Sequence, residues 1–352
     1  MTQTSETTAI DWDSARRRAA ALVRPGPVVE RAQAETLVAS LHGAARRAPA
    51  IVGDVTGLHG AASAASLLPV LVVDRPRWAE ANIAMFRDMI GEQLPTSGGW
   101  GSARMAGEEL GVMLSLLASR VLGQFDPFTP LPDGPGRLLV VAPNVLHLQR
   151  ELRLDAADFH LWVCLHEQTH AVQFSAAPWL PEHLRSAMTA LTTSIADTEE
   201  AARRLRAALE AIPRALAGDG ADATSGGAII GAVLDAEEQV QLERILAVMS
   251  LLEGHADVVM DEAGPQVVPT VERIRRAFEA RRGGHGLIDV LLRRLLGLDA
   301  KLAQYREGAA FVRGVLTTVG HTGLNAVWTG PEQLPSADEI ADPAAWVRRV
   351  HG

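Results

Sequence analysis

The chain has 352 residues, of which 47% are hydrophobic and 21% are charged. This composition is typical of a globular protein with a substantial core, and it excludes fibrous, collagen-like and disordered classes. Thirty-three basic residues against 42 acidic residues give a formal net charge of −9, so nucleic acid is not an expected partner.

Cysteine content and apolar segments indicate the compartment. Cys164 is the only cysteine, which excludes an intrachain disulfide and a cysteine-rich zinc knuckle. The first ten residues are polar and lack the basic and apolar blocks of a secretory signal. No apolar stretch reaches the length of a membrane span. We therefore expect a cytoplasmic protein without a membrane partner, and the sequence carries no signal for an oligomeric state.

The N-terminal part of the sequence predicts helices around a small sheet. Residues 1–10 are expected to be disordered. Helical periodicity covers four stretches, namely an opening segment before Pro25 and residues 28–47, 77–92 and 103–123. Short β-branched runs predict strands at residues 68–74 and 137–142, with residues 144–149 as a candidate third strand.

From Asp155 onward the pattern is almost continuously helical. Its breaks lie near residues 178–181, 216–231, 264–265 and 283–286. We predict a mainly α protein with a small β-sheet, an α+β fold in which 11–352 form a single domain. Its N-terminal helical and small-sheet part covers 11–150, and its helical, metal-binding part covers 151–352.

The segment LWVCLHEQTHAVQF contains the pattern HExxH, with His166, Glu167 and His170. Residues four apart on a helix point within about 40° of each other, so both imidazoles can bind one ion. The helix is predicted to begin at Asp155, whose side chain suits an N-cap. The two histidines share a stripe with Phe159 and Phe174 and other apolar residues, and are expected to face the core. A short pattern of this kind also arises by chance, and the alternative is a hydrogen-bonded core cluster.

A hydrolytic zinc site has three protein ligands and an open position for water. On the predicted helix from about residue 235 to 261, Glu253 and Asp257 interrupt an apolar stripe. Glu253 is the favoured third ligand, with His255 and Asp257 as alternatives, although His255 lies about 200° around the helix from Glu253. Asp257 also suits a carboxylate that orients a liganding imidazole, or a buried acid paired with an arginine.

Several segments together resemble a known family. They are HEQTHAVQFSAAPWL, LLEGHADVVMDEAG, VLGQFDPF, LLVVAPNV, QYREGAAFV and LNAVWTGPEQLPSADEI. From residue 52 to the end, the sequence resembles a gluzincin-type, zincin-like family of actinobacterial zinc metalloproteases, some of which carry a deazaflavin-coenzyme-biosynthesis label.

This resemblance implies a zincin-like architecture with the HExxH motif on a central helix. It also implies that His166, His170 and Glu253 hold zinc and that Glu167 is the base. The deazaflavin label implies no particular reaction step. Asp257 departs from the bulkier aromatic residue or glutamate that many zincins have at this position.

The motif chemistry predicts a zinc-dependent hydrolase. The expected activity is that of a peptidase in which a zinc-activated water attacks a carbonyl and Glu167 acts as general base. Tyr305, His255 and His321 are candidates for stabilising the oxyanion. Cys164 is expected to be a small core residue rather than a nucleophile.

Two other functions fit the same motif. One is a binding module with the zincin fold in which the metal is structural or vestigial, and the other is a metallohydrolase of small metabolites. The expected partners are therefore a peptide or a small-molecule substrate. A metal site without an exchangeable water would favour the first alternative, and an enclosed pocket would favour the second.

Overall fold

The computed structural model describes residues 9–91, 100–130, 136–196, 236–282 and 308–352. The predicted disorder at the N-terminus and the predicted breaks at 216–231 and 283–286 fall wholly or mainly outside these ranges. The elements are α1 (Trp12–Leu22), α2 (Arg31–Thr56), α3 (His59–Ala65), β1 (Val70–Val73), α4 (Arg75–Ile90), α5 (Trp100–Leu117), β2 (Gly123–Asp126), β3 (Arg137–Val141), α6 (Ala142–Glu151), α7 (Ala156–Ala176), α8 (Leu180–Ala196), α11 (Ala236–Val267), α12 (Val271–Arg282), α14 (Gly308–Leu324), η2 (Asn325–Trp328), η3 (Pro331–Gln333), α15 (Ala337–Ala341) and α16 (Pro343–His351). The protein is mainly helical with a small sheet, which confirms the predicted α+β fold class.

By contacts, the chain divides into two compact units. The first comprises Met1–Pro181 and Val259–Arg281, and the second comprises Glu182–Val258 and Arg282–Gly352. The single domain over 11–352 stays a prediction. No helix in the described ranges combines the length and the apolar content that a membrane crossing requires.

The sheet of the first unit has three strands in the order β1-β3-β2. β1 pairs with β3 in parallel, with Val70 opposite Leu138, and β2 pairs with β3 in antiparallel orientation, with Gly123 opposite Val140. β3 is therefore the central strand, and β2 forms an edge of this sheet. Successive side chains of a strand point to opposite faces, so β3 supplies both faces with apolar residues.

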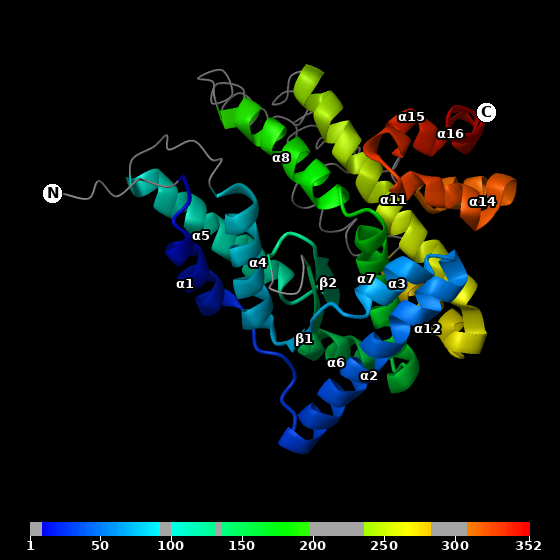
Figure 1. The fold of residues 1–352 in the computed structure, drawn as a ribbon. Helices are drawn as coiled ribbons and strands as arrows, with labels where there is room; N and C mark the ends of the chain where they lie inside the picture. Colours follow the sequence, from blue (N-terminus) through cyan, green and yellow to red (C-terminus); the bar gives the residue numbers. More distant parts are fainter. Residues whose placement is uncertain (1–8, 92–99, 131–135, 197–235, 283–307) are drawn as a thin grey trace, which may run out of the picture. The chain divides into compact units, whose positions relative to one another are not determined.

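Helices cover both faces of the sheet (Figure 1). Leu139 and Val141 of β3 pack into a cluster with α1, α4 and α5 on one face. Leu138 and Val140 pack into a larger cluster with α2, α6, α7 and α12 on the other face. α7 thus lies in the interior of the first unit, with the sheet on one side and α2 on another. The C-terminal end of α11, with Val259, belongs to the same cluster.

The strand predictions are correct for two of three segments. Residues 68–74 and 137–142 contain β1 and β3, whereas residues 144–149 lie in α6. The third strand was therefore predicted wrongly. Pro143 occupies the first turn of α6, a position that proline favours because its missing N–H has no helical partner there. The actual third strand, β2, overlaps the end of the predicted 103–123 helix and has no β-branched residue.

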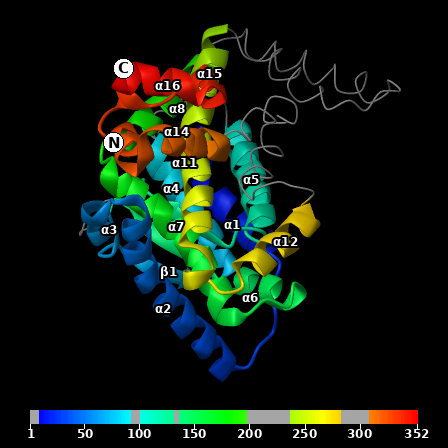
Figure 2. The ribbon, with the colours of Figure 1, turned by 90° about the vertical axis from the view of Figure 1, so that its right-hand side faces the viewer.

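The second unit contains α8, most of α11 and the C-terminal elements. α14, α15 and α16 lie together beside α11 (Figure 2). α11 and α14 approach so closely that a Cβ on Gly254 would lie 2.1 Å from the backbone carbon of Gly308. Trp346 of α16 is fully buried, and its indole N–H donates to the carbonyl of Gln333 at 2.8 Å. After α14 the chain forms only short helices, η2, η3, α15 and α16.

Candidate metal centre

The helix that carries the HExxH motif begins as its sequence predicts. Asp155 is the N-cap, and its Oδ1 accepts a hydrogen bond of 3.0 Å from the backbone N–H of Asp158. The Asp158 carboxylate in turn accepts bonds from the backbone N–H and the hydroxyl of Thr270, at 2.8 and 2.7 Å. The first bond satisfies a backbone N–H in the first turn of α7 that has no partner within the helix. The other two attach the start of α7 to Thr270, just before α12.

The interior of α7 is buried almost all round rather than along a single stripe. Phe159, Val163 and Leu165 are at most 2% exposed, and His170 is 8% exposed. The pair Phe159 and Trp162 also contacts the ring of Phe278 on α12. The motif therefore sits on a rigid, central helix, which is the kind of element that can hold ligands in a fixed geometry.

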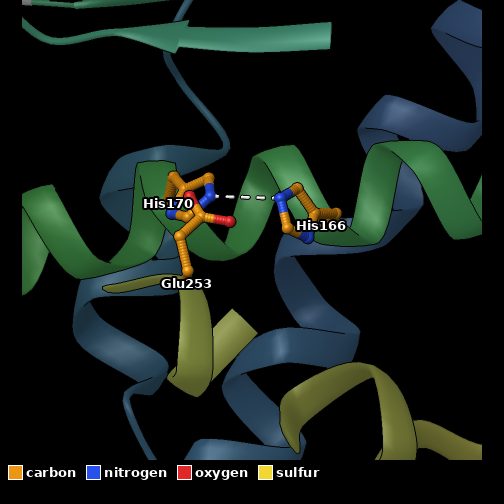
Figure 3. Close-up of side chains that lie close together, drawn as sticks. All are labelled: His166, His170 and Glu253. Carbon is orange, nitrogen blue, oxygen red and sulfur yellow. Dashed lines mark hydrogen bonds between the residues drawn. The ribbon is translucent and has the colours of Figure 1, made fainter. Parts of the chain in front are cut away.

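The imidazoles of His166 and His170 converge on each other (Figure 3). Their Nε2 atoms are 3.3 Å apart, and the ring planes are perpendicular, at 90°. Two nitrogen ligands at about 2.1 Å from one tetrahedral ion are about 3.4 Å apart. The observed separation of the two histidine nitrogens is therefore that of a zinc ligand pair.

Glu253 completes the cluster. One ligand atom each from His166, His170 and Glu253 lie within 4.8 Å of one another. Glu253 lies on α11, less than two turns before Val259, whose side chain is fully buried in the cluster around α7. The helical backbone of α11 is continuous between these two residues, since its non-helical residue is Gly264.

This donor set fits zinc. Two imidazoles and one carboxylate are ligands that zinc prefers, and three protein ligands leave one position of a tetrahedral ion open for water or substrate. Among the described residues, this is the group of histidine, cysteine and acidic side chains that can hold a metal ion. The arrangement therefore matches a hydrolytic site better than a closed structural site.

Glu167 is buried, at 8% exposure, and lies against the first residue of the edge strand β2. A Cβ placed on Gly123 would lie 2.5 Å from the Cγ of Glu167, 2.8 Å from its Cδ and 2.9 Å from its Oε1. Only glycine leaves space for the carboxylate in this position. Gly123 was not among the predicted site residues, although an isolated glycine in a strand is a recognised signal of close approach.

Gln173 was also not among the predicted site residues. It is fully buried, and its Oε1 lies 2.9 Å from Nδ1 of His170. Its spacing of three residues from His170 places both on one side of the helix, which was the available signal.

The other predicted site residues lie outside this cluster or outside the described residues. His255 is 1% exposed, and its ring contacts that of Trp328 with centroids 5.4 Å apart. Asp257 is exposed, which differs from the inward face that its spacing predicted. Tyr305 lies outside the described residues. His321 is half-buried near the end of α14 and does not belong to the metal-ligand group.

Cys164 is a core residue, as predicted. Its side chain is fully buried, and its Sγ lies 3.7 Å from the carbonyl oxygen of Leu41 on α2. Burial is the main cause that raises the pKa of the thiol well above its ordinary value, with the Glu167 carboxylate as a smaller cause. A buried thiol with a raised pKa is a poor nucleophile, in line with the predicted core role of Cys164.

A mainly helical chain with a small sheet, paired histidines on a central helix and a later glutamate is characteristic of the zincin class of metallohydrolases. The family model of zincin-like metallopeptidases matches residues 10–347, and the chain belongs to this family. It is also similar to a crystal structure from Chloroflexus aurantiacus, described as a "putative hydrolase with a novel fold". The identity is 31%, the match covers 97% of this chain and 98% of that one, and the TM-score is 0.67. No curated protein matches the chain.

Proposed function

We propose that this protein is a zinc-dependent peptidase in which His166, His170 and Glu253 bind the ion and Glu167 is the general base. Membership of the zincin-like metallopeptidase family supports a metallohydrolase in general. The observation that supports the finer proposal is the convergence of one ligand atom each from His166, His170 and Glu253 within 4.8 Å. The proposal includes no step of deazaflavin-coenzyme synthesis.

Each side chain has a separate task in this proposal. When bound, zinc supplies a Lewis acid that lowers the pKa of water and polarises a carbonyl group. Glu167 accepts the proton of the water whose oxygen forms a bond with the carbonyl carbon. The same carboxylic acid then gives the proton to the amine nitrogen as the carbon–nitrogen bond breaks. Both proton transfers require a carboxylate held in one place.

The contact between Glu167 and Gly123 supports this role for the carboxylate. The side chain of Glu167 lies on the backbone of β2, at a position where any Cβ would collide with it. A general base is effective only when it is held within hydrogen-bond reach of the proton that it accepts. Glycine at position 123 leaves room for the carboxylate to lie against the backbone of β2.

The substitution Glu167→Gln tests the proposal. It removes the proton acceptor and keeps the shape, so hydrolysis should fall by about 10²–10⁴-fold while bound zinc stays at one per chain. The probes are denatured casein and short acylated dipeptide amides, followed by mass spectrometry. Glu80→Gln, an exposed carboxylate on α4, is the matched control and should keep full activity.

Three results would contradict the proposal in different ways. Equal turnover in the Glu167→Gln variant would exclude Glu167 as the base. Cleavage of the small amides without cleavage of casein would point to a small-molecule hydrolase. X-ray absorption that finds four protein ligands and no exchangeable water would point to a structural metal in a binding module.

A further inference from the structure

A buried amide faces the back of one proposed zinc ligand. The Oε1 atom of Gln173 lies 2.9 Å from Nδ1 of His170, and Gln173 is 0% exposed. An amide oxygen accepts hydrogen bonds and cannot donate them, so Nδ1 must carry the proton in this contact. A neutral imidazole has one N–H, so Nε2 is the deprotonated ring nitrogen of His170 in this tautomer and accepts in its contact with Nε2 of His166.

The lone pair of this nitrogen points toward the proposed metal position. Nε2 of His170 is 3.3 Å from Nε2 of His166, and both belong to the group that includes Glu253. A histidine binds zinc through a deprotonated ring nitrogen, so the tautomer with the proton on Nδ1 is the one that this site requires. Without a partner at Nδ1, neutral histidine divides between two tautomers, and one of them presents a proton to the metal.

A second glutamine on the same helix shows what a purely packing role looks like. Gln168 is also buried, at 2% exposure, but its Nε2 donates to the backbone carbonyl of Ala45 on α2 at 3.1 Å. This bond joins two helices and contacts no histidine. Gln173 differs because its amide oxygen bonds to the ring of His170 on the same helix, and this bond joins no second helix.

We propose that Gln173 is a positioning residue that holds His170 in the Nδ1-protonated tautomer and so prepares Nε2 to bind zinc. The inference rests on the metal site of the proposed function. Partners of this kind affect metal affinity by about 10- to 100-fold in other metal sites. The effect acts through His170, and Gln173 itself contacts neither the metal nor a substrate in this proposal.

The test compares three variants with the wild-type chain. Gln173→Met keeps the length of the side chain but cannot accept from Nδ1. Gln173→Glu keeps an acceptor oxygen in the same place. Gln168→Met removes the other buried amide of α7 and is the matched control for loss of packing and stability.

The first readout is long-range ¹H–¹⁵N NMR of the metal-free protein with ring-labelled histidine. The resonances of His170 are assigned by their loss in His170→Gln. The wild type, Gln173→Glu and Gln168→Met should all show a protonated Nδ1 on His170. Gln173→Met should show a mixture of tautomers or a protonated Nε2.

The second readout is zinc affinity, measured by competition with a chromogenic chelator. The Kd should rise by about 10- to 100-fold in Gln173→Met and stay within about threefold of the wild-type value in Gln173→Glu and Gln168→Met. An unchanged His170 tautomer in Gln173→Met would overturn the inference, and so would an equal loss of affinity in Gln168→Met. The NMR readout needs neither metal nor substrate, so a failure of the peptidase proposal would leave it interpretable.

Discussion

Polar side chains occupy two opposite sides of α7, and they bond in different ways on each. On the side that packs against α2, each of three polar side chains has a bond to that helix. These are His160 Nδ1 with the Ser40 hydroxyl at 2.8 Å, Cys164 Sγ with the Leu41 carbonyl at 3.7 Å, and Gln168 Nε2 with the Ala45 carbonyl at 3.1 Å. On the other side, the Nε2 atoms of His166 and His170 point at each other and gather with the carboxylate of Glu253.

The difference separates packing from function within one helix. A buried polar group needs a hydrogen-bond partner, and a single bond to a neighbouring helix meets most of that need. Several imidazole and carboxylate ligand atoms that converge on one point can instead share a single metal ion as their partner. Convergence, rather than burial or residue type, therefore marks the candidate metal centre.

The largest expected effect compares the same substitution on both sides. His170→Gln removes a ligand, so zinc affinity should fall by more than the roughly 100-fold that the loss of an outer partner can cost. His160→Gln should leave the Kd within about threefold of the wild-type value. Chelator competition measures both, with circular dichroism to confirm folding. Equal losses of affinity would mean that the two sides of α7 do not have the separate roles described above.

The same comparison extends to α11. Glu253→Ala should lower zinc occupancy after dialysis at least about tenfold, because it removes the carboxylate ligand of the cluster. His255→Ala should leave occupancy close to one per chain, since the imidazole of His255 packs on Trp328 outside the metal-ligand group. Metal analysis of both proteins decides the point. Comparable zinc loss from the two variants would show that the third ligand is assigned wrongly.

Removal of zinc should lower the stability of the protein, because the ion would no longer link His166 and His170 of α7 to Glu253. A ligand that binds only the native state stabilises it by about 4 kcal/mol when its free concentration is a thousand times Kd. Excess chelator should therefore lower the Tm by several degrees, and added zinc should restore it. The His170→Gln variant is the control and should show no shift. An unchanged Tm in zinc-free wild type would indicate that the three side chains are satisfied without a metal.

A smaller effect concerns His160 on the packing side. Burial lowers the pKa of His160 to about 4, against about 6.5 in the unfolded chain. The neutral ring is favoured in the folded state, so its stabilising contribution is present above pH 6.5 and is lost as the pH falls toward 4. The loss is about 3 kcal/mol at pH 4.

The variant His160→Gln measures that contribution. Urea unfolding at pH 7 and at pH 4 should show a decrease in the free energy of unfolding that is about 3 kcal/mol smaller in the variant than in the wild type. Parallel decreases in both proteins would mean that His160 does not titrate with a lowered pKa.

Local signals were sufficient to predict the helix of the metal centre. The N-cap at Asp155, the four-residue spacing of His166 and His170, and the strands β1 and β3 all follow from short-range rules of sequence. The placement of Glu253 beside the histidines was a prediction from its position in an apolar stripe. The helix, its N-cap, the histidine spacing and the face of α11 that carries Glu253 are each encoded by residues close together in the chain, whereas the proximity of Glu253 to the histidines depends on the fold.

The missed features depend on contacts between distant segments. β2 has the sequence GQFD and forms because its backbone pairs with β3, so residue propensity gives no signal for it. The close approach of Gly123 to Glu167 can likewise be predicted only when the position of β2 in the fold is known. Asp257 shares an apolar stripe with Glu253, yet it is exposed, because a rotation of about 40° on α11 is enough to move a side chain to solvent.

Because Cys164 is buried, its reaction with alkylating reagents can be used to measure local opening of the protein around it. A thiol reacts with alkylating reagents through its thiolate, and this one is enclosed where α7 packs on α2, with a raised pKa. Modification therefore requires a local opening of that interface, and the rate of labelling gives the free energy of the opening when reclosing is fast. Since the chain has no other cysteine, every labelled molecule records the separation of the same two helices.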